Sequence, residues 1–373
     1  MDFAALDGHS PPVAGRSPSS DHGEGCADAP IYGRTSPAIE THESHGVPSI
    51  RESLREQGVS AEGAETIMAS WKPGTGKQYR PHIRRWTQFC HRRDIDPVNP
   101  TAPEIINFLT ETFHRNVGYD SINTARGALS SLGIVVNGCR AGVHPLVIRF
   151  MRGVFNLRPT KPRYTETWDV KPVLQKLRTM YPLKNLSLKE VTLKLVMLMA
   201  LTQAARVQTL HLLVLNGITI GDDFISVPLG GILKQGRPSY NIRRIKFQAY
   251  PKDASLCVCE TLKCYIKATQ EHRQITQLND IKLFISFIKP HKAVSKDTIA
   301  RWLRTMLNMS GVNTNTFTAG SVRPAAASKA KAMAVPIECI MAKAGWSRET
   351  TFATYYDKHI VTGTDAFQEA VLE

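Results

Sequence analysis

Four separated segments of the chain carry side chains whose types suit phosphate chemistry. They are Thr202–Leu213 with Arg206, a turn beside Lys234, Thr318–Ala325 with Arg323, and Ala344–Asp357 with two adjacent tyrosines. A planar, permanently charged guanidinium can bind phosphate oxygens bidentately, an ammonium can transfer a proton, and a phenolic oxygen can act as a nucleophile. Each segment alone is weak evidence, because a lone arginine is usually a solvated charge.

The order and spacing of these segments resemble those of the integrase-type tyrosine recombinases. Their amino-acid sequences most resemble the recombinases of DIRS-type retrotransposons. The similarity covers about residues 48–360, and its most specific stretches are Ala205–Leu210, Pro290–Trp302 and Gly345–Tyr356. The resemblance implies a mainly α fold, with an N-terminal all-α core-binding (SAM-like) domain and a mostly α catalytic domain that contains a small antiparallel β-sheet. In the family, the two domains form a clamp around DNA.

The resemblance also implies a role for each cation. Arg206 and Arg323 match the two arginines that bind the non-bridging oxygens of the scissile phosphate, and Lys234 matches the lysine that acts as general acid towards the leaving 5′-oxygen. The chemistry of the side chains agrees, because guanidinium groups stabilise charge that develops on a phosphate in the transition state.

The segment with the adjacent tyrosines supplies the remaining members of the family's set. Trp346 matches a position that is His or Trp in the family, where its indole N–H either donates to a phosphate oxygen or only packs. Tyr356 aligns with the nucleophile of the DIRS-type sequences, whereas Tyr355 has the spacing from Trp346 that is common in bacterial and phage members. We expect Tyr356 to be the nucleophile and keep Tyr355 as the alternative.

The reaction that the resemblance implies proceeds through a covalent 3′-phosphotyrosyl intermediate, which preserves the energy of the phosphodiester bond. Religation then needs neither ATP nor a divalent metal. We therefore expect no cofactor and no metal site, and the sequence contains no Walker-type glycine loop. A phenol has a pKa near 10, so the arginines and a nearby base must assist the attack.

One position departs from the family's pattern. The second arginine motif normally reads His-x-x-Arg, and Gly320 stands in place of the histidine. The loss of that hydrogen-bond donor predicts weakened activity. Pro324 is expected to disturb the direction of the Arg323 side chain, because a proline disfavours helical geometry in the residue before it. His211 and His291 are present as substitutes, although both are more simply explained as structural residues.

The elements that must position these residues fall into two domains. Residues 48–158 are predicted to form short helices without a convincing strand, among them helices over 75–90, from 101 and around 121–136. A basic helix face is more often a solvated surface than a binding surface, but here the positive character continues towards the domain boundary. The residues expected to contact DNA are Lys77, Arg80, Arg84, Arg85, Arg149 and Arg152.

Residues 159–168 are predicted to be an extended linker, because the run 158–164 is rich in proline and basic residues. The second domain, 169–373, begins with a buried helix over 191–202 after the capping box of Ser187 and Glu190. Short β-type runs follow at 224–227, 230–234 and 242–247. Helices are then expected around 299–307 and over 321–333, 336–344 and 347–358.

Composition and charge are compatible with this organisation. The net charge is +15, yet residues 1–47 hold two basic and seven acidic residues, so we expect a disordered acidic leader before a strongly basic protein. The seven cysteines are odd in number and scattered, which argues against a disulfide framework. The group Cys257, Cys259 and Cys264 lacks zinc-site spacing and is predicted to be buried thiols.

These observations predict double-stranded DNA as the partner, with self-association into a tetramer expected by analogy with the family. The sequence shows neither a signal peptide nor a stretch able to cross a membrane, and a eukaryotic DNA substrate would imply the nucleus. The alternatives are a DNA-binding protein that has lost catalysis through Gly320, and a helical interaction protein without a nucleic-acid role. The target site and the direction of recombination are not encoded in any recognisable way.

Overall fold

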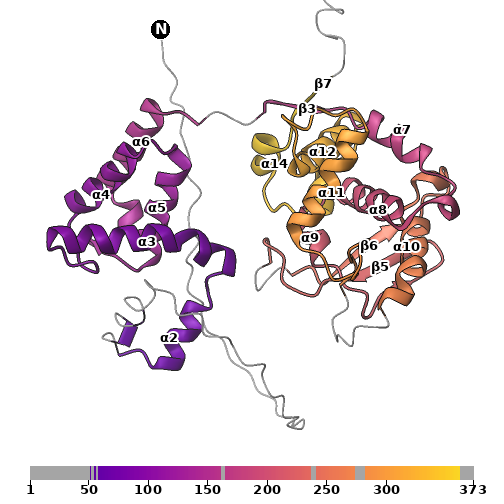
Figure 1. Cartoon of the computed structure of the whole chain (residues 1–373). Coiled ribbons are helices and arrows are strands. Elements are labelled where there is room, and N and C mark those ends of the chain that lie inside the picture. The colour runs from indigo at the N-terminus through magenta and orange to yellow at the C-terminus, as the bar shows by residue number, and fades with distance from the viewer. Residues whose placement is uncertain are drawn as a thin grey trace, which may run out of the picture. The chain divides into compact units, whose positions relative to one another are not determined.

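The computed structural model describes residues 51, 54–55, 58–160, 164–236, 241–273 and 282–361. The chain divides into two compact units, Met1–Thr160 and Lys161–Glu373, and the predicted leader over residues 1–47 lies outside the described residues. Helices dominate both units, and the larger of the small sheets is antiparallel (Figure 1). The predicted fold class is confirmed.

The first unit is built from helices joined by short turns. Their bounds are α2 (Ala61–Met68), α3 (Pro73–Arg93), α4 (Ala102–His114), α5 (Tyr119–Ser131), the 3-10 turn η1 (Ala141–Val143) and α6 (Pro145–Leu157). The predicted capping box opens α4: the Thr101 hydroxyl accepts from the Glu104 N–H, and the Glu104 carboxylate accepts from the Thr101 N–H. These bonds satisfy backbone donors that the first helical turn leaves free.

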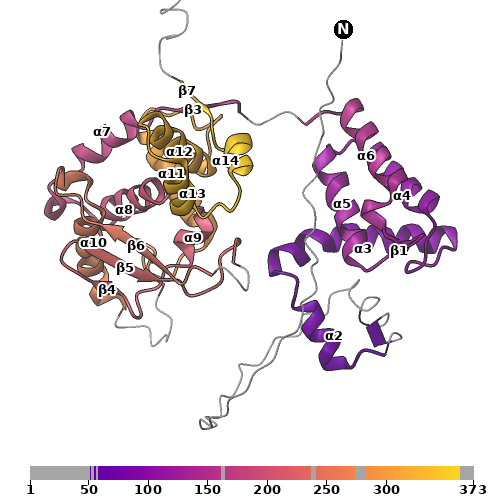
Figure 2. The same cartoon turned by 180° about the vertical axis from the view of Figure 1, so that it is seen from behind.

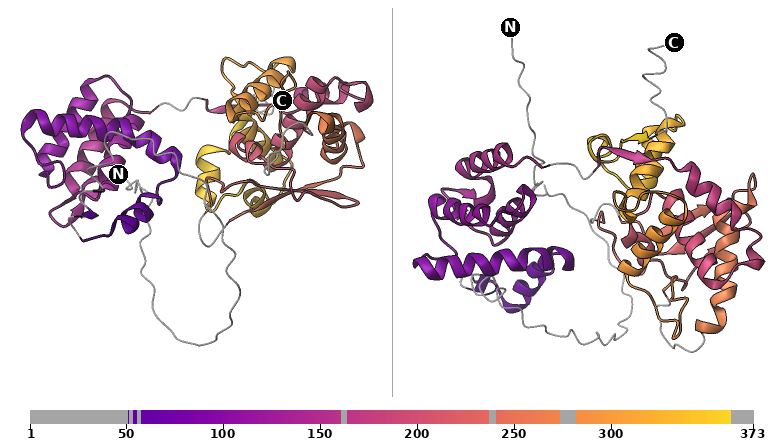
Figure 3. Two further views of the ribbon diagram at one scale, coloured as in Figure 1. Left: turned by 60° about the horizontal axis from the view of Figure 1, so that its bottom comes forward. Right: turned by 45° about the horizontal axis from the view of Figure 1, so that its top comes forward.

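Aromatic side chains fill the core of the first unit. Trp86 and Phe89 of α3 meet Phe108 of α4, with ring centroids 5.2–5.8 Å apart. The Trp86 indole is almost fully buried and donates its N–H to the Pro97 carbonyl, so its one polar atom is satisfied. The 21-residue helix α3, seen lengthwise in Figure 3, therefore buries one face and leaves its polar face in solvent.

One expectation for the first unit is wrong. The helix predicted around 121–136 ends at Ser131, and the chain forms a small hairpin of β1 (Val135–Val136) and β2 (Cys139–Arg140). Asn137 and Gly138 make the turn with φ values of 48° and 76°. Asn-Gly favours such a turn because both residues tolerate positive φ, and this signal outweighed the helical pattern.

The second unit contains the larger number of elements. Its helices are α7 (Lys171–Thr179), α8 (Leu188–Thr202), α9 (Val207–His211), α10 (Val258–Arg273), α11 (Lys296–Met309), α12 (Val322–Ala332), α13 (Ile337–Ala344) and α14 (Glu349–Tyr355), with 3-10 turns η2 (Leu183–Asn185), η3 (Ala254–Leu256) and η4 (Ala319–Ser321). Its strands are β3 (Glu166–Trp168), β4 (Thr219–Ile220), β5 (Phe224–Pro228), β6 (Arg244–Gln248) and β7 (His359–Val361).

Helix α8 runs through the centre of the second unit. Every residue from Val191 to Ala200 is buried, and α9, α10, α11 and α12 all pack against it. The predicted capping box of Ser187 and Glu190 opens this helix. Lys194 is the one charged residue of the buried stretch, and its ammonium donates to the Leu177 and Met180 carbonyls at the end of α7. An apolar helix surrounded on all sides is the framework on which the other elements rest.

The antiparallel sheet has the order β4-β5-β6, and α10 lies alongside it (Figure 2). Ile225 pairs with Phe247 in the register of β5 and β6, and both side chains are buried. The β-type run predicted at 230–234 is wrong: the chain there bends and turns. Gly230 and Gly231 explain the difference, because glycine weakens a strand and lets the backbone pass close to Val214.

The ends of the second unit are joined by a parallel pair of strands. Glu166, Thr167 and Trp168 of β3 lie opposite His359, Ile360 and Val361 of β7, and α12 contacts both strands. The Trp168 indole donates to the Ser321 hydroxyl at the start of α12. The latter part of the segment expected as a linker is thus a strand of the second unit.

The three clustered cysteines of the second unit are buried or half-buried thiols. Cys257 and Cys259 are buried as predicted, burial raises the pKa of Cys259 to about 11, and Cys264 is half-buried. No three His, Cys, Asp or Glu side chains in the described part of the chain are grouped so as to hold a metal ion. Among the same residues, no helix has the length and apolar character needed to traverse a bilayer.

Candidate active site

Arg323 lies in the first turn of α12, and its side chain enters the interior of the second unit. Its Nη1 donates to the Ala204 carbonyl (2.7 Å) and its Nη2 donates to the Ala344 carbonyl (2.9 Å). Only 4% of the residue is exposed. Pro324 leaves Arg323 helical, because a proline in the first turn of a helix removes no intrahelical hydrogen bond. The direction of this arginine is therefore set by two carbonyls from distant segments.

Arg206 stands at the N-cap of α9, two residues after Ala204. Its Nη1 donates to Oε1 of Gln235 at 2.8 Å. Ala204 has a φ of 41°, a left-handed conformation that costs free energy in a residue with a Cβ, and in this conformation it presents its carbonyl to Arg323. The strained bend at Ala204 therefore supplies an acceptor for Arg323 and lies two residues before Arg206.

The two guanidinium groups act on each other electrostatically. Burial and then the positive charge of Arg206 lower the pKa of Arg323 to about 10, and the Tyr356 phenol opposes the shift. Arg323 therefore remains protonated at neutral pH. Two cations held together against their repulsion make a place where an anion is stabilised.

Trp346 and Tyr356 complete the group around Arg323. Their ring centroids lie 4.4 Å apart, and the Arg323 Cζ atom lies 4.4 Å from the Trp346 centroid and 5.1 Å from the Tyr356 centroid. Gly345 ends α13 with a φ of 70°, a conformation that glycine adopts readily, and turns the chain into Trp346. Cation–π contacts of this kind hold a guanidinium plane in a fixed orientation.

The backbone of Tyr356 is fixed by α12, the helix that carries Arg323. The Ser328 hydroxyl donates to the Tyr356 carbonyl (2.9 Å), and the Lys358 N–H donates to the Ser328 hydroxyl oxygen (3.0 Å). Lys331 and Asp357 form an ion pair beside them. Tyr355, by contrast, is 65% exposed. Of the two tyrosines, Tyr356 is the one with ring contacts to the cationic group.

Two donors in this group are buried without an acceptor. Neither Nε of Arg323 nor Nε1 of Trp346 has a hydrogen-bond partner within the part of the chain that the structure describes. A buried donor without a partner costs about 1–3 kcal/mol, so such atoms are uncommon. Five further buried side-chain atoms lack a partner among the described residues, but these two belong to side chains in cation–π contact, and the charge of Arg206 acts on one of them. The pair is suited to donate to an anionic oxygen.

Lys234 lies in the turn that follows Gly230 and Gly231, and its side chain is exposed. The next residue, Gln235, accepts the hydrogen bond from Arg206. Ring contacts therefore join Arg323, Trp346 and Tyr356 directly, and Arg206 acts on Arg323 through its charge. Lys234 is next in the chain to the residue that accepts from Arg206.

Gly320, where the family resemblance leads us to expect a histidine, has open space around it. Gly320 is exposed in η4, and a Cβ placed on it would meet only the Thr318 hydroxyl oxygen, at 3.8 Å. Neither suggested substitute is seen in the cluster. The His291 ring stacks on His272 and bonds the Ser286 carbonyl, and burial lowers the pKa of His211, which is also held low by Lys282.

The predicted DNA contacts of the first unit are divided between two helices. Lys77, Arg80 and Arg84 are exposed on α3, and Arg85 is half-buried there. Among the described residues, none of these four forms an ion pair. Arg92, near the end of the same helix, is paired with Glu111. The N-terminal two thirds of α3 therefore keep their positive charge available.

Helix α6 carries the other two predicted contacts, Arg149 and Arg152, and both are exposed. Arg158, the C-cap residue of the same helix, turns inward instead. It donates to the Phe113 and Val117 carbonyls and lies 3.8 Å from the Phe113 ring centroid. It satisfies carbonyls near the end of α4 and is a structural residue.

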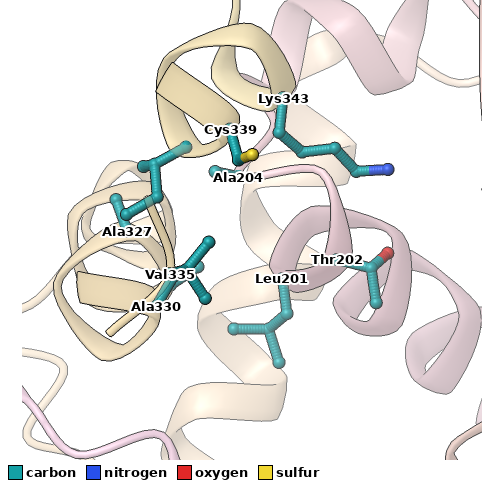
Figure 4. Close-up of a pocket in the computed structure, with 10 residues that line it drawn as sticks. Leu201, Thr202, Ala204, Ala327, Ala330, Val335, Cys339 and Lys343 are labelled. Carbon is teal, nitrogen blue, oxygen red and sulfur yellow. The ribbon is translucent and has the colours of Figure 1, made fainter. Parts of the chain in front are cut away.

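An apolar pocket of about 250 Å³ lies between α8, α12 and α13 (Figure 4). Short side chains, including Ala204, Ala327 and Ala330, leave the space, and Cys339 and Lys343 of α13 also line it. Ala204 and Ala327 belong as well to the small apolar cluster under Trp346. The pocket therefore shares a wall with the candidate site, and sequence patterns gave no sign of it.

Two residues of the site were not singled out from the sequence. The only feature of the sequence that could have pointed to Gln235 is its place beside Lys234. No feature pointed to Ser328, because its role depends on a contact with a residue 28 positions later in the chain. Both are neutral polar residues of common type.

Comparisons with known proteins place the fold. No protein-family model and no curated protein sequence matches the chain. Solved structures do match. The Tn1549 transposon integrase in complex with transposon right-end DNA has a TM-score of 0.53 at 10% identity, over 87% of this chain and 97% of that one. The XerH site-specific recombinase bound to its palindromic difH substrate has a TM-score of 0.51 at 10% identity, over 75% of each chain. This chain has the fold of these recombinases.

Proposed function

We propose that the chain is a tyrosine recombinase that cuts and rejoins double-stranded DNA through a 3′-phosphotyrosyl intermediate. The observation that carries the proposal is the pair of buried donors without acceptors, Arg323 Nε and Trp346 Nε1, beside Arg206 and the Tyr356 ring. A phosphodiester has the charge and the several acceptor oxygens that this group lacks. The fold shared with DNA-bound recombinases supports the same conclusion.

In this proposal each side chain has one task. Arg206 and Arg323 bind the non-bridging oxygens of the scissile phosphate, and the Trp346 indole donates a further hydrogen bond. The Tyr356 phenol releases its proton to solvent water as its oxygen attacks phosphorus, and the DNA 5′-oxygen leaves with a proton from Lys234. In religation, a 5′-hydroxyl attacks the phosphotyrosine and releases the phenol. Positioning and electrostatic stabilisation thus supply the catalysis.

The finer parts of the proposal rest on the sequence resemblance. The chain is proposed to belong with the DIRS-type recombinases, to bind DNA with a core-binding domain over 48–158 through α3 and α6, and to assemble as a tetramer on two duplexes. The domain after the linker 159–168, residues 169–373, is the catalytic one. The nucleus is its expected location. Gly320 is proposed to weaken the activity.

The test is covalent capture. A library of nicked duplexes of randomised sequence is incubated with the protein, and adducts are isolated under denaturing conditions. The protein should yield a DNA adduct at Tyr356. Tyr356→Phe should yield none, and Tyr355→Phe, altered at the exposed neighbour, should react as the unaltered chain does. An adduct at Tyr355 would overturn the assignment of the nucleophile.

A second function is favoured by Gly320, which removes a donor from the phosphate site. The chain would then be a DNA-binding protein that keeps the fold and has lost cleavage. In that case duplex binding should be tight at low salt, fall steeply as salt rises, and be accompanied by no adduct. Absence of binding as well as of adduct would contradict both functions.

A further inference from the structure

We infer that Gln235 is a positioning residue: it orients Arg206 through a neutral hydrogen bond and connects that arginine to the lysine turn and to the segment before Trp346. The inference rests on the proposed recombinase function and adds a residue to its machinery. The contact that carries it is the hydrogen bond from Arg206 Nη1 to Gln235 Oε1, 2.8 Å long.

The neutrality of this acceptor matters. Arginines at fixed positions are commonly held by carboxylates, and a carboxylate cancels the charge that it orients. Among the described residues, Arg206 has no carboxylate in ion-pair range, and its side chain donates to Gln235. An amide oxygen fixes one guanidinium nitrogen and leaves the full positive charge, with four further N–H groups, for a phosphate.

The amide nitrogen of Gln235 faces another segment of the site. A Cβ placed on Gly345 would lie 2.7 Å from Gln235 Nε2, so the side chain packs directly over this glycine. Gly345 is the residue that turns α13 into Trp346. Gln235 therefore touches Arg206 with one end of its amide and the backbone before Trp346 with the other.

The turn that carries Gln235 is itself fixed. Leu233 is buried, and the Gly236 N–H donates to its carbonyl at 2.9 Å. Lys234 lies between Leu233 and Gln235, so the bond from Arg206 also ties down the turn that carries the proposed general acid. A shift of this turn would displace two proposed catalytic groups together, and displacements of about 1 Å cost roughly 100-fold in rate.

Two substitutions of Gln235 test separately whether it orients Arg206 and whether its neutrality preserves the charge of Arg206. Gln235→Met keeps the length of the side chain and removes the acceptor, so adduct formation in a single turnover should slow about 10- to 100-fold while duplex Kd and Tm stay nearly unchanged. Gln235→Glu keeps an acceptor oxygen but neutralises Arg206, so duplex Kd should rise about 5-fold or more. A residue with a merely structural role would lower Tm and would show no such split.

The contact with Gly345 has a matched control. Gly345→Ala strains a positive-φ backbone and also meets the Gln235 amide, whereas Gly311→Ala strains a similar backbone (φ +78) with nothing within 4 Å. Gly345→Ala should slow adduct formation far more than Gly311→Ala. In a Gln235→Ala background, which removes the amide that the added methyl would meet, the extra effect should shrink. Equal effects of the two alanines would contradict the contact.

The failure of this inference is distinguishable from failure of the proposed function. If the unaltered chain forms an adduct and Gln235→Met forms it equally fast, only the role of Gln235 is wrong. If the unaltered chain forms none, the proposed cleavage is wrong, and duplex Kd still tests the contact. Gln235→Glu should then weaken binding in the unaltered background but change it less than two-fold with Arg206→Met. An equal loss in both backgrounds would overturn the inference.

Discussion

Two buried arginines of the second unit show how a structural cation differs from a candidate catalytic one. Arg273, at the end of α10, is 9% exposed, and all three of its nitrogen atoms have partners: the Thr269 hydroxyl and the Lys282 and Leu283 carbonyls. Arg323 is 4% exposed and also binds two carbonyls, but its Nε has no partner among the described residues.

The charges around the two arginines differ as well. The Tyr265 phenol supports the charge of Arg273, and Tyr265 in turn accepts the Ile285 N–H. The Tyr356 phenol supports the charge of Arg323 in the same way, but a second arginine, Arg206, opposes it. A structural arginine thus has its hydrogen bonds and charge satisfied within the fold. A site for an anionic ligand keeps both partly unsatisfied, at a cost in stability.

The largest expected effect is on the rate of DNA cleavage when Arg323, the candidate catalytic arginine, is replaced. Arg323→Met removes the Nε–H donor that has no partner among the described residues, and one charge, from the proposed phosphate site. Single-turnover adduct formation should fall at least 1,000-fold, which corresponds to about 4 kcal/mol of transition-state stabilisation. Rapid-quench assays with a duplex recovered in the capture experiment would measure it. A decrease of less than ten-fold would remove Arg323 from the machinery.

The stability of the same two positions sharpens the comparison. Arg273→Met leaves two buried carbonyls unpaired and should lower the free energy of unfolding by about 3 kcal/mol. Arg323→Met also relieves a repulsion and an unpaired donor, so its cost should be nearer 1 kcal/mol. Urea denaturation of both variants measures the difference. The reverse order of stability would contradict the distinction drawn here.

Restoring the absent histidine should increase activity. Gly320→His adds an imidazole at an exposed position where a Cβ would meet only the Thr318 hydroxyl oxygen, at 3.8 Å. One recovered donor to the phosphate should speed adduct formation about 10- to 100-fold. Gly320→Ala serves as the control, because it changes the backbone freedom without adding a donor. If histidine and alanine act alike, Gly320 is not a weakened catalytic position.

Lys194 offers a third buried cation and the smallest effect. Burial lowers its pKa from 10.5 to about 8, so between pH 8 and 10.5 the unfolded chain binds more protons than the folded one. Stability should therefore rise with pH in this window, by about 1 kcal/mol per pH unit. Lys194→Met should remove that rise. Urea denaturation at pH 8 and pH 9.5 compares the two chains, and an equal slope in both would place the titration elsewhere.

Much of the secondary structure could be predicted because its signals are local. Both capping boxes and the apolar periodicity of α3, α8 and α11 lie within single stretches of sequence. The hairpin of β1 and β2 was also encoded locally, in Asn137 and Gly138, but two residues per strand are too few to show alternation. The mistaken strand at 230–234 shows that β-type residues do not outweigh adjacent glycines.

The site was only partly predictable, because its geometry depends on contacts between distant segments. Residue types and the resemblance identified Arg206, Arg323, Trp346 and the two tyrosines as candidates. The resemblance favoured Tyr356 over Tyr355, but the residue types alone could not separate the two phenols, because the fold creates the contacts of Tyr356 with Arg323 and Trp346. Nor could the residue types reveal that Arg158 turns inward, since a terminal arginine looks the same whether it is solvated or bound to carbonyls.

The parallel pairing of β3 with β7 has a mechanical consequence. Because both strands run in the same direction, the chain arriving from residue 165 enters the ladder at the rung between Glu166 and His359, three residues after Tyr356. Three backbone rungs therefore connect the first residues of the second unit to the segment that follows Tyr356. The start of this unit and the chain after the tyrosine are held to each other although they lie more than 190 residues apart in the sequence.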